Sequence, residues 1–214
     1  MFTDQAHAAT RTSWAASKHH PFIQALQAGT LPAATFRYYL IQDHHYLQEF
    51  ATIHDLAADQ ATDPQAAHQL RAGAEHLRQG EMAVRETFFR QLAITDAEIA
   101  ATPMAPTGYA YTSHLYRSLA TLGTAGAVIA LLPCYWLYAE IGHDLAHQGS
   151  PVPIYQAWID TYNADDYAGE MPDQLALANR VATPQNTPAL LDIFQKSSWY
   201  ELHFWQMALD HETW

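Results

Sequence analysis

Residues Ser118–Ala139 read SLATLGTAGAVIALLPCYWLYA and contain no charged side chain. A stretch of this length and apolarity could span a bilayer. It is interrupted, however, by Thr121, Gly123, Pro133 and Tyr138, and the acidic Glu140 follows it closely where a span would carry basic residues. These features favour a helix buried at the centre of a soluble protein over a membrane span.

The rest of the chain also predicts helices. Alanine and glutamine are frequent, and no run of alternating Val, Ile and Thr or hairpin turn indicates a strand. Gly29 is expected to close a short helix that opens at His20, and Thr35 is expected to cap a longer one. The predicted helices cover about 4–17, 21–29, 35–59, 64–92, a short segment from 96, 108–122, 124–147, 154–162, 171–182 and 188–212. We therefore expect one all-α domain over residues 1–214.

Charge and cysteine content exclude several classes of function. The chain has 10 Lys and Arg against 22 Asp and Glu, a net charge of -12. Such an acidic surface repels phosphate, so nucleic acid and anionic membranes are poor partners. The single cysteine, Cys134, excludes an internal disulfide and any cysteine-based zinc site. A free thiol and an N-terminus without a signal-peptide pattern predict a cytoplasmic protein.

Reactive side chains lie within aromatic stripes at helical spacing. Cys134 shares a helix face with Tyr138, and Asp43 lies one turn from Tyr46. A third such residue is Glu201, which shares a face with Phe204 and Trp205. The residues alone leave alternatives open, because a lone cysteine is often a small buried hydrophobe and Asp43 could equally face solvent.

Histidine and glutamate spacing raises the possibility of a metal site. Glu140-x-x-His143 copies half of a ferritin-like carboxylate motif, and a di-iron centre needs a second copy on another helix. His45 and Glu49 are the nearest equivalent, but they do not have that form. We therefore expect no metal, and we interpret these histidines as partly exposed or supporting groups.

One thiol, two carboxylates and many phenols and indoles suit a flat, nitrogen-rich ring. Aromatic faces can sandwich such a ring, while one carboxylate accepts hydrogen bonds from its amidine-like edge. A second carboxyl group can protonate the opposite ring nitrogen, which makes a ring carbon electrophilic enough for attack by a thiolate.

Motifs from end to end resemble the TenA family of thiaminase II or aminopyrimidine aminohydrolase enzymes. YYLIQDHHYL at 38–47 is similar to the family signature Y-x-x-Q-D-x-x-Y, and LPCYWLYAEIG at 132–142 is similar to the motif that carries its nucleophile. AYTSHLYR at 110–117, YQAWIDTY at 155–162 and YELHFWQMA at 200–208 resemble its tyrosine-bearing and C-terminal motifs. Only the stretch 165–184 matches nothing in the family pattern.

This resemblance implies a haem-oxygenase-like helical bundle without haem or other cofactor, assembled as a homotetramer. It implies hydrolysis of 4-amino-5-aminomethyl-2-methylpyrimidine, and of thiamin, to the hydroxymethyl pyrimidine used in thiamin salvage. Cys134 would be the nucleophile, as in the cysteine-containing branch of the family, Glu201 the acid and base at the ring nitrogen, and Asp43 the residue that holds the amino edge. The residues implied to line the pocket are Tyr46, Tyr111, Tyr138, Tyr162 and Phe204.

Two other functions remain open at this point. The chain could be an oxidase of the same helical fold, cofactorless or di-iron, with Cys134 incidental. It could also bind thiamin or a related pyrimidine without turnover, keeping the aromatic pocket and Asp43.

Overall fold

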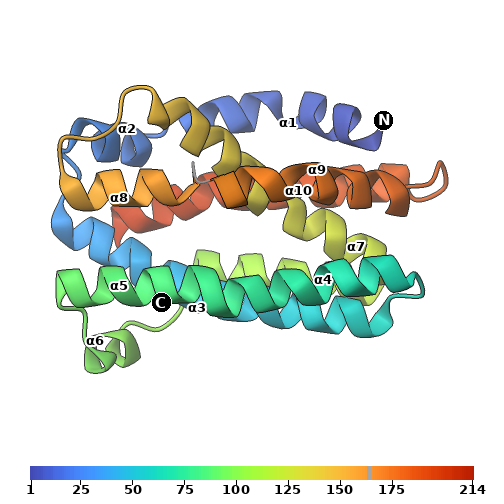
Figure 1. Ribbon diagram of the computed structural model, residues 1–214, viewed down its shortest axis with the longest axis horizontal. Coiled ribbons are helices and arrows are strands. Elements are labelled where there is room, and N and C mark those ends of the chain that lie inside the picture. The colour runs from blue at the N-terminus through green and yellow to red at the C-terminus, as the bar shows by residue number, and fades with distance from the viewer. Residues whose placement is uncertain (163–164) are drawn as a thin grey trace. The chain divides into compact units, whose positions relative to one another are not determined.

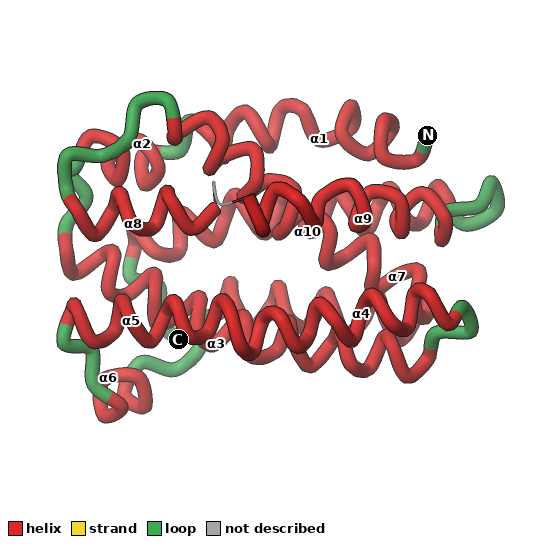
Figure 2. The backbone as a smooth tube through the Cα atoms, in the orientation of Figure 1, coloured by secondary structure: helices red, strands yellow, loops and turns green. Residues whose placement is uncertain are grey.

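The computed structural model describes residues 1–162 and 165–214, and the side chains of residues 81–85 and 165–170 are outside this description. Within the described residues every element is a helix and none is a strand (Figure 2). The elements are α1 (Phe2–Lys18), α2 (Pro21–Ala28), α3 (Ala33–Gln60), α4 (Pro64–His76), the π-helical turn η1 (Leu77–Glu81), α5 (Met82–Leu92), α6 (Asp96–Ala101), α7 (Pro106–Ala146), α8 (Pro153–Tyr162), α9 (Asp165–Val181) and α10 (Thr187–Asp210). The all-α prediction is therefore confirmed.

Local sequence signals explain where several helices begin and end. At the start of α2 the Nδ1 atom of His20 accepts a hydrogen bond from the amide of Phe22 at 3.3 Å, and Pro21 occupies the first turn. Gly29 ends this helix in the left-handed conformation with φ 72°. Asp63 and Thr95 cap α4 and α6 through their side-chain oxygens.

The helices group into two compact units. Unit 1 contains Met1–Leu31 and Val128–Gln206, and in it α1 packs against α9 while α8 contacts α2 and α9. Unit 2 contains Pro32–Ala127 and Met207–Trp214, and in it α3 lies beside α4 and α5 (Figure 1). Both α7 and α10 contribute residues to each unit. The expectation of one domain over 1–214 stays a prediction.

The apolar stretch at 118–139 forms the middle of α7. The helix is interrupted at Gly123, where φ 58° and ψ -149° are not helical, so the predicted break between 122 and 124 is confirmed. Pro133 lies inside the helix without ending it. Among the described residues α7 alone is long and apolar enough to cross a membrane, but 61% of its most apolar window is buried within the protein. That environment is typical of a core helix.

Three predicted boundaries differ from the structure. Thr35 does not cap α3, because that helix begins at Ala33 after Pro32, and the Thr35 hydroxyl lies 3.0 Å from His211 Nε2 instead. The single helix predicted over 64–92 consists of α4, η1 and α5. The backbone of α9 begins at Asp165, before the predicted start at 171.

Candidate functional site

Cys134 and Tyr138 lie one turn apart on the second half of α7, in unit 1. Cys134 is half-buried, whereas Tyr138 is buried. The ring of Tyr138 lies 4.9 Å from that of Tyr162 on α8 and 5.2 Å from that of Trp205 on α10. Three helices of unit 1 therefore meet in an aromatic cluster beside the helix that carries the thiol.

A glycine allows α7 and α8 to approach closely enough for this cluster. A Cβ atom built on Gly142 would lie 2.7 Å from the carbonyl oxygen of Tyr162. No side chain larger than hydrogen fits at that distance, so Gly142 sets the spacing between the two helices. The spacing in turn places the Tyr162 ring against Tyr138.

Glu201 and Phe204 occupy the inner face of α10. Both side chains are 2% exposed, and Trp205 beside them is fully buried with its ring stacked 5.4 Å from that of Phe22. Acidic side chains are rarely this deeply buried in cores. A buried acidic side chain next to aromatic rings is therefore a candidate functional group.

Unit 2 holds the remaining predicted site residues. Tyr46 on α3 and Tyr111 on the first half of α7 stack with ring centres 5.0 Å apart and planes 29° apart. Asp43, one turn before Tyr46, is 3% exposed. The alternative of a solvated Asp43 is therefore wrong, and this carboxylate lies inside the protein beside a pair of stacked phenols.

The predicted site residues are divided between the two units. Unit 1 holds Cys134, Tyr138, Tyr162, Glu201 and Phe204, and unit 2 holds Asp43, Tyr46 and Tyr111. That all of them face one pocket stays a prediction.

The groups weighed as metal ligands have other partners. Glu140 Oε1 lies 3.1 Å from His7 Nε2, and Glu140 Oε2 lies 2.7 Å from Lys18 Nζ. Burial disfavours the charged form of Lys18, but hydrogen bonds and charge attraction from Glu140 and Asp144 outweigh this effect and raise its pKa. Glu140 therefore links α7 to α1.

The second candidate pair is engaged in a similar way. Nε2 of His45 lies 2.9 Å from the carbonyl oxygen of Thr102, and Glu49 accepts a hydrogen bond from Tyr116. No group of three or more His, Cys, Asp or Glu that could hold a metal ion occurs in the part of the chain that the structure describes.

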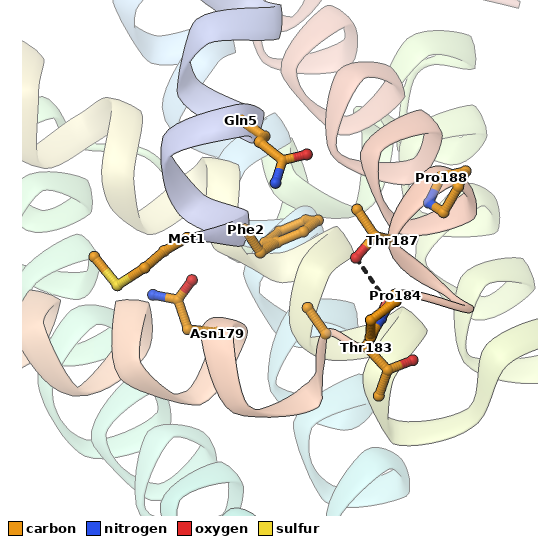
Figure 3. Close-up of a pocket in the computed structure, with 9 residues that line it drawn as sticks. Met1, Phe2, Gln5, Asn179, Thr183, Pro184, Thr187 and Pro188 are labelled. Carbon is orange, nitrogen blue, oxygen red and sulfur yellow. Dashed lines mark hydrogen bonds between the residues drawn. The ribbon is translucent and has the colours of Figure 1, made fainter.

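A separate pocket of about 410 Å³ opens beside the start of α1. Figure 3 shows Phe2 and Gln5 of α1 opposite Thr183 and Thr187, and the Thr187 hydroxyl donates to the carbonyl of Thr183 at 2.7 Å. Its full lining consists of Met1, Phe2, Gln5, Asn179, Ala182, Thr183, Pro184, Thr187 and Pro188. None of these lining residues carries an acidic, basic or thiol side chain.

Sequence reasoning did not assign some residues that the structure places beside the candidate site. Trp158 is fully buried and contacts Tyr138, Tyr162 and Trp205. Its spacing from Tyr155 and Tyr162, at i, i+3 and i+7, places the three aromatic side chains on one face of α8 and could have identified it. Gln42, next to Asp43, belongs to the signature motif, but its contacts with residues far along the chain leave no local signal in the sequence.

Sequence comparisons identify relatives with a named activity. The chain is 37% identical to the aminopyrimidine aminohydrolase of Bacillus subtilis over 216 residues, which cover 100% of this chain and 92% of that protein. It is 28% identical to the aminopyrimidine aminohydrolase of Helicobacter pylori, covering 91% of this chain and 92% of that protein.

Solved structures of similar proteins share the helical fold. The TenA homologue protein from P. horikoshii OT3 is 26% identical and has a TM-score of 0.92, covering 98% of this chain and 99% of its own. A domain with a heme oxygenase-like fold from Shewanella denitrificans, 12% identical, has a TM-score of 0.75 and confirms the predicted fold class. A model of the TENA/THI-4/PQQC family matches residues 7–211, and the chain therefore belongs to this family.

Proposed function

We propose that the protein is an aminopyrimidine aminohydrolase of thiamin salvage. It would convert 4-amino-5-aminomethyl-2-methylpyrimidine, and thiamin, to the 5-hydroxymethyl pyrimidine. The observation that carries this proposal is the full-length likeness to aminopyrimidine aminohydrolases in a chain that has a half-buried thiol and two buried carboxyl groups among aromatic side chains.

Binding would use the aromatic faces and one carboxylate. Stacked phenols such as Tyr46 and Tyr111 offer flat surfaces for the pyrimidine ring. Asp43 would accept hydrogen bonds from the amino edge of the ring, a geometry in which a carboxylate is a strong acceptor. This arrangement selects a ring that carries an amino group beside a ring nitrogen.

Catalysis would pass through a covalent adduct with Cys134. Glu201 donates a proton to a ring nitrogen, and the Cys134 thiolate adds to the adjacent ring carbon, forming a C–S bond. The electron pair of the ring then expels the amine from the exocyclic carbon, and the amine takes up the proton that the thiol released. Water adds to that carbon and loses a proton. The ring regains its aromaticity by expelling the thiolate, which takes up the proton from water, and Glu201 recovers the proton that it gave to the ring nitrogen. Overall one water enters and one amine leaves.

Product identification tests the activity. The purified protein is incubated separately with thiamin and with the aminomethyl pyrimidine, and the products are identified by mass spectrometry. Formation of the hydroxymethyl pyrimidine with one equivalent of amine supports the proposal. Binding of either compound without turnover would instead support the non-enzymatic binder, and consumption of oxygen would support an oxidase.

Two variants test the mechanism. Cys134→Ser keeps the shape of the side chain but removes the better nucleophile, so turnover should fall by several powers of ten while pyrimidine binding persists. Glu201→Gln should lower the rate by about 10²–10⁴-fold, the usual effect of losing general acid–base catalysis. The double variant should be hardly slower than either single one, because both residues act in the same step. Near-normal turnover by Cys134→Ser would rule out the covalent route and favour direct attack by water.

We also propose a cytoplasmic homotetramer. Few charges cover the surface, and Trp199 and Tyr109 are 50% and 58% exposed, which supports burial of apolar surface between subunits. Light scattering at micromolar concentration measures the mass, and a monomer would contradict the proposal.

A further inference from the structure

Side chains bind four backbone groups of the connection between α6 and α7, residues 102–105. Nε2 of His45 lies 2.9 Å from the carbonyl oxygen of Thr102, and Nε2 of Gln42 donates to that of Pro103 at 2.9 Å. The indole N–H of Trp214 donates to the carbonyl of Met104 at 3.0 Å. Irregular backbone usually bonds to itself or to water, so these side-chain bonds indicate that the connection is held in one position.

Gln42 binds this connection at two points. Its amide nitrogen donates to Pro103, and its amide oxygen accepts from the backbone N–H of Ala105 at 2.8 Å. The side chain is 1% exposed, so both bonds form away from water, where losing them is costly. Gln42 directly precedes Asp43, so the same turn of α3 carries the proposed pyrimidine acceptor and fixes the residues just before α7.

The C-terminal residues His211–Trp214, here called the latch, hold the start of α7 from a second direction. Glu212 Oε2 accepts a hydrogen bond from the backbone N–H of Thr107 at 2.8 Å, in the first turn of α7. The first N–H groups of a helix lack partners within the helix and attract negative charge, so this carboxylate is a favourable cap.

The latch is itself held in place by α3. His211 adopts the left-handed conformation, with φ 49°, which turns the chain at the end of α10. Its ring stacks 5.0 Å from that of Tyr38, and its Nε2 lies 3.0 Å from the Thr35 hydroxyl. Tyr38 donates a hydrogen bond to the backbone carbonyl of Glu212, and burial with the nearby Glu212 charge raises the pKa of Tyr38 to about 12. The Tyr38 hydroxyl therefore remains a donor at neutral pH.

The first half of α7 is thus tied to α3 at its N-terminal end, and one turn further on it carries Tyr111, which stacks on Tyr46 of α3. We propose that Gln42 and Glu212 are positioning residues of the pyrimidine site. They fix the axial position of the first half of α7 relative to α3 and so align Tyr111 with Tyr46 and Asp43. The inference rests on the proposed function, because it assigns those three residues to substrate binding.

Glu212→Ala tests the proposal against a matched control, Glu98→Ala. Glu98 is also a carboxylate in unit 2, but it lies on α6 and pairs with Arg37 on α3. Loss of the cap should raise KM for the aminomethyl pyrimidine by about tenfold and leave kcat within about threefold, because ring binding is disturbed more than chemistry. Glu98→Ala should leave both parameters within about twofold. Glu212→Gln retains an acceptor for the Thr107 N–H and should restore KM to near the wild-type value.

Gln42→Leu provides a second variant of similar volume without either hydrogen bond. It should raise KM as Glu212→Ala does. A purely structural role would lower the melting temperature of these variants and leave KM at the wild-type value at a temperature where all variants are folded, and that result would overturn the proposal.

Hydrogen exchange separates failure of this inference from failure of the proposed function. Amides of residues 108–115 should exchange faster in Glu212→Ala and in Gln42→Leu, but not in Glu98→Ala. This measurement needs no substrate. If the wild-type protein hydrolyses no aminopyrimidine, the proposed function fails, and the exchange result alone then decides whether the latch holds α7. Wild-type exchange in both variants would refute it.

Discussion

Replacing Gly142 by alanine would test whether the contact between α7 and α8 sets the geometry of the aromatic cluster. The new Cβ would lie 2.7 Å from the Tyr162 carbonyl oxygen and 2.8 Å from the Tyr162 Cβ, whereas ordinary contact begins at 3.4 Å. These neighbours are the backbone of Tyr162 and its Cβ atom, which is fixed to that backbone. No flexible side chain can therefore move aside. The helices must therefore separate by several tenths of an ångström.

The size of the effect follows from two opposing contributions. Alanine in a helix stabilises the folded state by up to about 1 kcal/mol relative to glycine. Inserting a methyl group into a packed contact costs about 1–3 kcal/mol. The contact is with backbone, so the upper part of this range applies, and we expect Gly142→Ala to lower the free energy of unfolding by about 1–2 kcal/mol. Because Tyr162 moves away from Tyr138, KM for the aminomethyl pyrimidine should also rise.

Gly80→Ala is the matched control. The same methyl group there would meet the imidazole ring of His76, with Nε2 at 3.4 Å, so it should leave stability unchanged or slightly raised. Urea unfolding of both variants measures the difference, with KM determined in parallel. A Gly142→Ala protein as stable as the wild type would refute the argument that this glycine sets the spacing between the helices.

Two further predictions concern titratable groups. Burial is the main reason that the pKa of His54 falls from its usual 6.5 to about 4. Below pH 6.5 the unfolded chain therefore binds a proton at this residue more readily than the folded chain does. The free energy of unfolding should decrease by about 3 kcal/mol between pH 6.5 and 4 and should level off at lower pH. His54→Phe should flatten this dependence in urea unfolding curves recorded from pH 7 to 4, and an unchanged slope would contradict the assignment. Lys18→Met removes the ammonium group that lies 2.7 Å from Glu140 and 3.0 Å from Asp144. Because these groups are partly exposed, the free energy of unfolding should fall by at most about 1 kcal/mol, and by less at 1 M salt. Equal losses at low and high salt would exclude an ionic contribution.

The helical fold could be predicted because its signals are local. Gly29 and Pro21 mark helix ends through their own backbone preferences, and Gly123 interrupts α7 where the sequence predicts a break. The predicted cap at Thr35 was wrong because a competing partner, His211, lies far along the chain. The π-helical turn η1 also had no recognisable signal, so the helix predicted over 64–92 is divided.

The burial of two acids could be anticipated from the sequence. Asp43 and Glu201 were candidates because acids within aromatic stripes are unusual, and both are buried; their roles were implied by the family resemblance and stay predictions. The resemblance to the TenA family is confirmed by the match over residues 7–211. Cys134 could not be assigned from composition, since a lone cysteine is more often packing than nucleophile. The motif around it supplied that assignment.

The proposed positioning residues form contacts between distant parts of the chain. Gln42 binds Ala105, and Glu212 binds Thr107, so each bond joins segments separated by many residues. Helical periodicity carries information over a few turns only, and therefore cannot reveal such pairs. A reactive thiol and acid act only when the ring is held in the correct geometry, because small misplacements lower rates steeply. Residues such as Gln42 and Glu212 can therefore be found only from the folded structure, because the bonds that they form do not exist in the local sequence.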